Sequence, residues 1–161
     1  MKKLFLIFLC LLAPNYCYAA CASVHVKGQL MCRGRPYVGE MVQIWEPKIF
    51  DEMWSDQKTG VDGRFEMATN GNDVTLVDIP LLNFGFKPYL WINNFCGTEV
   101  MNGERCTKNL VKIPIPEWYV NPCRPDVHIF DIGVFEMDTV KGEDYNWFEK
   151  FLGYGKHCRS Y

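Results

Sequence analysis

The chain has 161 residues, eight cysteines and a formal net charge of −2 at pH 7. This length suits one domain that can bury a hydrophobic core of its own. The mildly acidic, mixed charge offers no basic surface, so nucleic acid is excluded as an expected partner.

The N-terminal segment has the layout of a secretory signal peptide. A basic start precedes the unbroken apolar run Leu4–Leu12, and Cys17 and Ala19 are small residues at the −3 and −1 positions of a cleavage site. The apolar run is too short to span a bilayer. We therefore expect residues 1–20 to be removed, by cleavage after Ala19 or Ala20. Residues 21–161 would then form a secreted, extracellular domain without integral membrane association.

A bacterial lipoprotein signal is the competing interpretation of this segment, because Ala19-Ala20-Cys21 resembles a lipidation site. However, Tyr18 stands where a leucine-like residue is expected, and acylation of Cys21 would leave an odd number of thiols. Ordinary cleavage instead leaves an even set of cysteines, which an exported protein is expected to oxidise to disulfides. This set comprises Cys21, Cys32, Cys96, Cys106, Cys123 and Cys158.

The body of the chain is predicted to consist of short strands separated by turns. In the first strand, apolar residues alternate with polar ones, a pattern typical of a strand with one buried face. The turn dipeptide Asp62-Gly63 precedes another strand, and Asn70–Asp73 is predicted to form the next turn. Such a series predicts an all-β sandwich or barrel. The expected strands are Val24–Leu30, Met41–Glu46, Arg64–Thr69, Val74–Ile79, Tyr89–Phe95, Lys108–Ile115 and Val127–Met137.

Aromatic residues outside these strands are the candidate contacts for a partner, because Trp and Tyr dominate binding hot spots. One lies in the predicted loop Pro47–Lys58, two precede Cys123, and two lie in the aromatic tail Gly142–Tyr154. The alternative is that they cover the open ends of the protein's own core. The candidates are Trp54, Trp118, Tyr119, Trp147 and Tyr154.

The sequence lacks a recognisable catalytic or metal-binding motif. It has three histidines, no Cys-x-x-Cys and no histidine pair at helical spacing, which argues against zinc. The acidic residues Asp51, Glu52 and Asp56 lack the alternating ligands and the glycine of a calcium loop, so a solvated loop is expected there. We therefore expect neither a cofactor nor an enzymatic activity.

One set of segments is informative through its order and spacing along the chain. The segments are Val24–Cys32, Gly34–Pro36, Val42–Trp45, Lys58–Phe65, Pro88–Ile92, Cys96, Cys106, Lys112–Pro116, Phe130–Gly133 and Cys158. Together they resemble the nematode transthyretin-like family. The resemblance implies a secreted, disulfide-stabilised transthyretin-like (prealbumin-like) β-sandwich of about seven strands, here with an aromatic-rich C-terminal tail and no cofactor.

The resemblance also implies a disulfide pattern, because in that fold the first strand lies parallel to the last long strand and their ends meet. The pairs expected on this basis are Cys21–Cys123, Cys32–Cys158 and Cys96–Cys106.

The function that the resemblance implies is a binding or carrier module for an unknown extracellular ligand or receptor. The ligand would be a lipid, a small hydrophobic molecule or a receptor surface. The alternative is a hydrolase of the 5-hydroxyisourate hydrolase type that uses His25 and His128 on one sheet face. The chain lacks the Tyr-Arg-Gly-Ser end that marks that hydrolase family.

Overall fold

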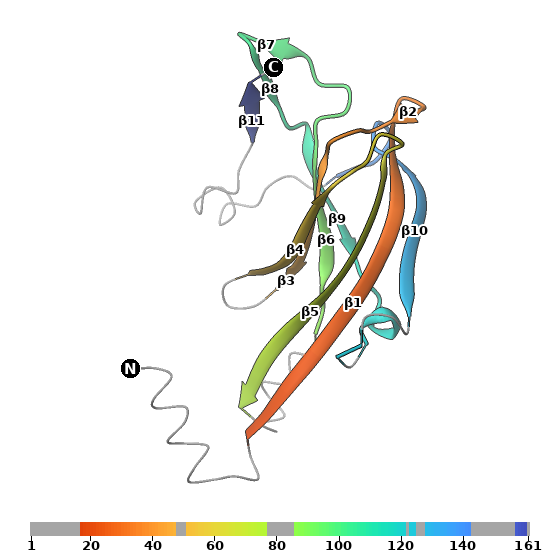
Figure 1. Cartoon of the computed structure of the whole chain (residues 1–161). Helices are drawn as coiled ribbons and strands as arrows, with labels where there is room; N and C mark the ends of the chain where they lie inside the picture. Colours follow the sequence, from red (N-terminus) through yellow and green to blue (C-terminus); the bar gives the residue numbers. More distant parts are fainter. Residues whose placement is uncertain are drawn as a thin grey trace.

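The computed structural model describes residues 17–47, 51–76, 86–121, 123–124, 128–142 and 157–160. Nearly all of its elements are strands, as expected for an all-β protein (Figure 1). Among these residues, no helix has the length and apolar character that crossing a membrane requires. The elements are β1 (Cys17–Cys32), β2 (Arg35–Pro36), β3 (Met41–Glu46), β4 (Glu52–Lys58), β5 (Arg64–Leu76), β6 (Tyr89–Asn94), β7 (Val100–Met101), β8 (Glu104–Cys106), β9 (Asn109–Pro114), the 3₁₀ turn η2 (Glu117–Tyr119), β10 (Ile129–Glu136) and β11 (Cys158–Ser160).

Two larger sheets form the body of the molecule, and a third small sheet lies at one end. In the first sheet, β1 lies between β10 and β5, and β2 pairs with the last two residues of β1. The second sheet has the order β4-β3-β6-β9. The small sheet, β11-β8-β7, joins the C-terminal strand to the hairpin of β7 and β8 (Figure 1).

The core lies between the two larger sheets, which makes the fold a sandwich. Alternate residues of β3 are buried, so Val42 and Ile44 face inward while Gln43 faces outward, as the sequence pattern predicts. They pack in one cluster with Val24 and Val26 of β1. Burial of these apolar side chains supplies the main stabilising free energy of the fold.

β1 and β10 pair in parallel, as the resemblance implies, with His25 opposite Ile129. The register shifts between Lys27 and Gln29, where β10 carries an extra residue. Gly28 lies at this bulge, and a Cβ atom there would run into the side chain of Ile132. The absence of a side chain at this position lets Ile132 pack over the backbone of β1.

Asn94, the last residue of β6, is a fully buried polar residue that ties three groups together. Its Nδ2 donates to the Met137 carbonyl oxygen at 2.9 Å and to Asn109 Oδ1 at 3.0 Å. Its Oδ1 accepts the backbone N–H of Cys96 at 2.9 Å. This side chain therefore connects the end of the second sheet to the residue that follows β10.

Two sequence predictions about the strands were wrong. The segment Pro47–Lys58 is not all loop, because β4 occupies its second half and pairs with β3. Asn70–Asp73 is not a turn, because β5 continues through it to Leu76 along the extended start of β1. The predicted separate strand Val74–Ile79 is therefore the end of β5 as far as Leu76, and its last residues lie outside the described part of the chain.

One of the three expected disulfides is present, and the other two are exchanged. Cys21–Cys123 is confirmed and joins the residues before β10 to β1. Cys32 is bonded to Cys96, not to Cys158, and Cys106 is bonded to Cys158, not to Cys96. The reason is the small sheet: β11 pairs with β8 and sets Cys158 opposite Cys106, with Cα atoms 4.0 Å apart. Cys96 is left beside Cys32, with Cα atoms 5.7 Å apart.

Candidate functional site

Trp118 is the most exposed of the predicted contact residues that the structure describes. It lies on η2 near the start of β10 (the short cyan turn in Figure 1), and 72% of the residue is open to solvent. Its indole ring lies 4.9 Å from the imidazole of His128, centroid to centroid. A large aromatic side chain is thus presented to solvent beside a polar ring.

The segment that carries Trp118 is held by β1 and by His128, the residue before β10. The backbones of Ser23 and Asn121 exchange two hydrogen bonds, of 2.7 and 2.8 Å. The buried Asn121 side chain donates from Nδ2 to the carbonyl oxygens of Tyr119 and His128, each at 3.2 Å. Its Oδ1 is therefore an acceptor, and His128 Nδ1 donates to it at 3.1 Å. Together with the Cys21–Cys123 disulfide, these contacts fix the turn on β1.

The other described aromatic candidates contact the protein's own core. Tyr119 is half-buried and its ring lies 5.1 Å from that of Phe130. Trp54 lies on β4 rather than in a loop, and its half-buried ring meets Phe86 edge-on at 5.9 Å. Both pack against the main core cluster. Trp147 and Tyr154 lie outside the described residues.

The two histidines of the hydrolase alternative do not share a site. His25 lies opposite Ile129, and its Nε2 is 2.7 Å from Glu66 Oε1 on β5. His128 lies one residue before Ile129, in the segment that precedes β10. Its partners are Asn121 and Trp118 instead. Each histidine therefore has its own partners, which gives no support to the hydrolase alternative.

A groove of about 400 Å³ lies on the first sheet, and most of the residues that line it have polar or charged side chains. Lys27 Nζ and Asp131 Oδ2 lie 3.5 Å apart in it. The N–H of Gly133, which donates to Asp131, and the nearby ammonium of Lys27 hold the pKa of that carboxyl below its ordinary value. The groove is lined by Lys27, Gly28, Gln29, Gln57, Arg64, Phe65, Glu66, Asp131, Gly133 and Val134.

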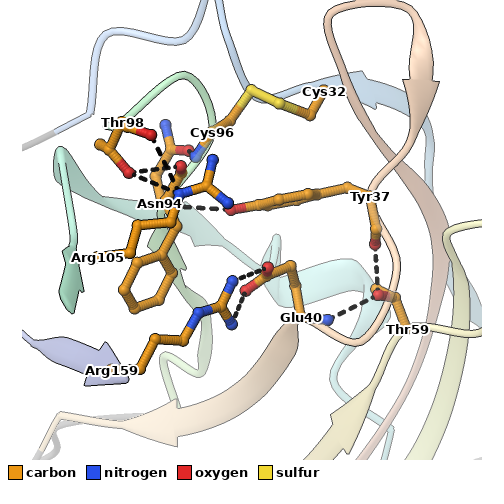
Figure 2. Close-up of polar contacts among 10 residues, drawn as sticks. Cys32, Tyr37, Glu40, Thr59, Asn94, Cys96, Thr98, Arg105 and Arg159 are labelled. Atoms are coloured by element: carbon orange, nitrogen blue, oxygen red, sulfur yellow. Dashed lines mark hydrogen bonds and ion pairs between the residues drawn. A yellow bond between two sulfur atoms is a disulfide. The ribbon is translucent and has the colours of Figure 1, made fainter. Parts of the chain in front are cut away.

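A partly buried ion pair joins the C-terminal strand β11 to the sandwich, at the end of the molecule opposite η2 (Figure 1, Figure 2). The Glu40 side chain is only 4% accessible, and its two carboxylate oxygens accept from Arg159 Nη2 at 2.6 Å and Nη1 at 3.1 Å. The Arg159 guanidinium also lies over the Phe95 ring, 4.2 Å from its centroid. Such bidentate and stacked contacts are the strongest that an arginine makes.

The backbone beside this ion pair is locked by Thr59 and Tyr37. The Thr59 hydroxyl accepts the N–H of Glu40 at 3.0 Å and donates to the Tyr37 carbonyl oxygen at 2.5 Å. The Tyr37 hydroxyl accepts the N–H of Phe95 at 2.9 Å (Figure 2). Burial, followed by the nearby Glu40 carboxylate, raises the pKa of Tyr37 far above its ordinary value, so this residue stays neutral.

Glu136 fastens the turn between β1 and β2. It accepts the backbone N–H groups of Arg33 at 2.8 Å and Gly34 at 3.1 Å. Partial burial opposes ionisation, but these two N–H groups and that of Asp138 outweigh it and hold the pKa of Glu136 below its ordinary value of 4.5.

Sequence reasoning missed Glu40, Phe95 and Arg159 as a group. They are distant in the chain, and none belongs to a motif. The one available signal was the position of Arg159 directly after Cys158, since a disulfide holds its neighbours close to the body of a protein.

The chain is similar to several proteins of Caenorhabditis elegans. It is 29% identical to transthyretin-like protein 5 over 136 residues, which cover 82% of this chain and 88% of the relative. It is 27% identical to transthyretin-like protein 46, over 87% of this chain and 73% of the relative. It is 24% identical to transthyretin-like protein 2, over 71% of this chain and 74% of the relative.

A solved structure, a 9R-lipoxygenase from Cyanothece, aligns with 82% of this chain and 22% of its own, at 15% identity and a TM-score of 0.32. A score this low does not establish a shared fold. The model of the transthyretin-like family, in contrast, matches residues 27–116, which is more than half of the chain. The chain therefore belongs to the transthyretin-like family.

Proposed function

We propose that this protein is a secreted binding module that contacts another extracellular protein through the end of the sandwich that carries Trp118. The observation that carries the proposal is the 72% exposure of Trp118 on a turn that hydrogen bonds and a disulfide hold on β1. Trp is the residue type most enriched in binding hot spots. A side chain on a rigid turn loses little freedom when a partner covers it, so more of its contact energy contributes to affinity.

The groove on the first sheet favours a protein as the partner rather than a small hydrophobic ligand. Sites for such ligands are lined mainly by apolar side chains, whereas this groove contains Lys27, Arg64, Glu66 and Asp131. The charge of the chain argues against an anionic membrane, because loss of Lys2 and Lys3 with the signal peptide changes the formal charge from −2 to −4. Anionic lipid surfaces attract basic segments, not acidic proteins.

Secretion is supported by the signal-peptide layout and by three disulfides, which persist in oxidising compartments. β1 begins at Cys17, before the expected cleavage sites. Cleavage would remove the first residues of β1 and leave Cys21 at or beside the new N-terminus. The disulfide to Cys123 would then hold that end on the sandwich.

Capture from extracellular fluid tests the proposal, with Trp118→Ser compared to the wild type and to Val61→Ser. Val61 is 89% exposed in the turn between β4 and β5. Val61→Ser is therefore a matched control, because it also removes an exposed apolar side chain. Mass spectrometry should recover a protein with the wild type and with Val61→Ser. Trp118→Ser should bind this protein about thirtyfold more weakly, as expected for a hot spot of about 2 kcal/mol, with an unchanged melting temperature.

Equal recovery by all three proteins would contradict the proposal. So would a Trp118-dependent binding seen only with phosphatidylcholine or phosphatidylserine vesicles, because that result would assign the surface to a membrane. The proposal also expects no turnover of 5-hydroxyisourate, because His25 and His128 have separate partners.

A further inference from the structure

The residues that hold Arg159 form a complete site for a guanidinium group, which we call the arginine cleft. The cleft consists of the Glu40 carboxylate, the face of the Phe95 ring and the edge of β8. Three separate segments outside β11 supply these parts. The N–H of Glu40 donates to Thr59 and the N–H of Phe95 donates to Tyr37, which fixes two of the parts in place. The cleft is therefore built by residues outside the C-terminal strand, and Arg159 is its occupant.

The chemistry of the cleft selects arginine. A carboxylate that is 4% accessible is strongly destabilising without a cation, so the site requires a positive charge. A planar guanidinium satisfies both carboxylate oxygens and stacks on an aromatic ring at the same time. A lysine ammonium is a point charge that cannot make the paired contact, so it fits the cleft less well.

The occupant binds as an added strand. β11 pairs antiparallel with β8, with Arg159 opposite Arg105 and Ser160 opposite Glu104. An extended peptide that adds to a sheet edge and places one side chain in a pocket is a general mode of peptide recognition. β11 has three residues, so its backbone pairing alone is weak.

The Cys106–Cys158 disulfide supplies the remaining attachment, and it is accessible. Cys158 is exposed and Cys106 is half-buried, whereas the Cys32–Cys96 bond includes the fully buried Cys96. A tether raises the effective concentration of the tail at the cleft and so excludes competing segments. The state of this one bond therefore decides whether another segment can compete.

We propose that the arginine cleft is a peptide-recognition site for an extended, arginine-bearing segment, and that β11 occupies it until the Cys106–Cys158 disulfide is reduced. A dithiol reductant breaks the sulfur–sulfur bond by thiol–disulfide exchange. Two electrons and two protons pass to the protein sulfurs, which become two thiols, and the dithiol becomes a cyclic disulfide. β11 is then tied only by its pairing and by Arg159, and an arginine-bearing segment of another protein replaces it.

Chemical rescue of Arg159→Ala tests the cleft with all disulfides intact. Methylguanidinium at millimolar concentration should raise the melting temperature of this variant in a concentration-dependent way, because it binds the folded state. It should raise that of the wild type far less, since the cleft is full. Methylammonium should have little effect, and the double variant Glu40→Gln, Arg159→Ala should not respond. If Arg159→Ala does not fold alone, its refolding yield in methylguanidinium against methylammonium gives the same comparison.

A peptide test then examines access to the cleft. The probe is a fluorescent peptide, Lys-His-Ser-Arg-Ser, which copies the tail with serine in place of Cys158. It should bind the full-length variant Cys106→Ser, Cys158→Ser and the dithiol-treated wild type, but not the oxidised wild type. A peptide with lysine in place of arginine should bind about tenfold more weakly, because it loses the paired contact.

Equal melting shifts for Arg159→Ala and the double variant would overturn the proposal. Equal binding of the arginine and lysine peptides, or no binding of either after reduction, would overturn it as well. These outcomes are independent of the Trp118 surface, which lies at the opposite end of the sandwich (Figure 1).

Discussion

Replacing Asn94 by alanine is predicted to destabilise the sandwich strongly, because one side chain serves three partners. The substitution leaves the N–H of Cys96 and the carbonyl oxygen of Met137 without this partner, and both residues are fully buried. Each buried polar group left unsatisfied costs about 1–3 kcal/mol, so the two together should cost about 2–6 kcal/mol. Against a total stability of about 5–15 kcal/mol, this is a large fraction.

Asn109→Ala is the matched control, since it removes just one of the three hydrogen bonds. Asn109 is half-buried, so water can replace the lost contact, and a loss of about 1 kcal/mol is expected. The assay is guanidinium chloride unfolding of the oxidised proteins, followed by tryptophan fluorescence. If Asn94→Ala is less than about 1 kcal/mol less stable than Asn109→Ala, the reasoning from buried polar groups is refuted.

Three further predictions concern packing, pH and redox chemistry. Gly28→Ala should lower stability by about 1–3 kcal/mol because its Cβ would meet Ile132, while Gly60→Ala, which has more room, should change the unfolding midpoint little. The folded pKa of Glu136 lies below its unfolded value of 4.5, so its contribution to the free energy of unfolding is complete above that value and is lost as the pH falls through the folded pKa. When unfolding is measured at decreasing pH, Glu136→Gln should therefore lose less stability below pH 4.5 than the wild type. Identical stability curves for the two proteins would contradict this prediction. During graded dithiol treatment with alkylation and mass spectrometry, the disulfide of the buried Cys96 should be reduced last; its early reduction would show that burial does not protect it.

The sheets and most strands were predictable because their burial is periodic. β3 matches its predicted bounds, and its alternation of buried and exposed residues is the signal that the sequence displays. β4 has no such signal, since Trp54 and Ser55 are its only half-buried residues and the other five are exposed. Exposed edge strands resemble loops in composition. The turn residues Asn70–Asp73 were misread for another reason, since pairing with the extended β1 overrides their local preference.

The candidate site was predictable only in part. Trp118 was identified because a tryptophan in a loop has few places to be covered, and the structure leaves it exposed. Trp54 and Tyr119 satisfied the same criterion, yet the core covers them, which depends on tertiary contacts that the sequence does not display. The Cys32–Cys96 and Cys106–Cys158 disulfides follow from the β7–β8 hairpin, because β11 pairs with β8 and brings Cys158 to Cys106. The Asn102-Gly103 turn, with φ values of 54° and 79°, was the available signal for that hairpin.

The parallel pairing of β1 with β10 determines when this protein can complete its fold. The Cys21–Cys123 disulfide beside this pairing joins residues that are 102 positions apart. The pairing of β1 therefore cannot be completed until the 102 residues that follow Cys21 have been synthesised. Until β10 arrives, β1 can pair with β5, which precedes β10 in the chain, and the partially covered core remains open to other chains. Contacts between such distant residues slow folding and lengthen the exposure of unpaired edges. We therefore expect this protein to finish folding only after β10 has been synthesised, and to depend on oxidation of Cys21 and Cys123 to retain the final arrangement.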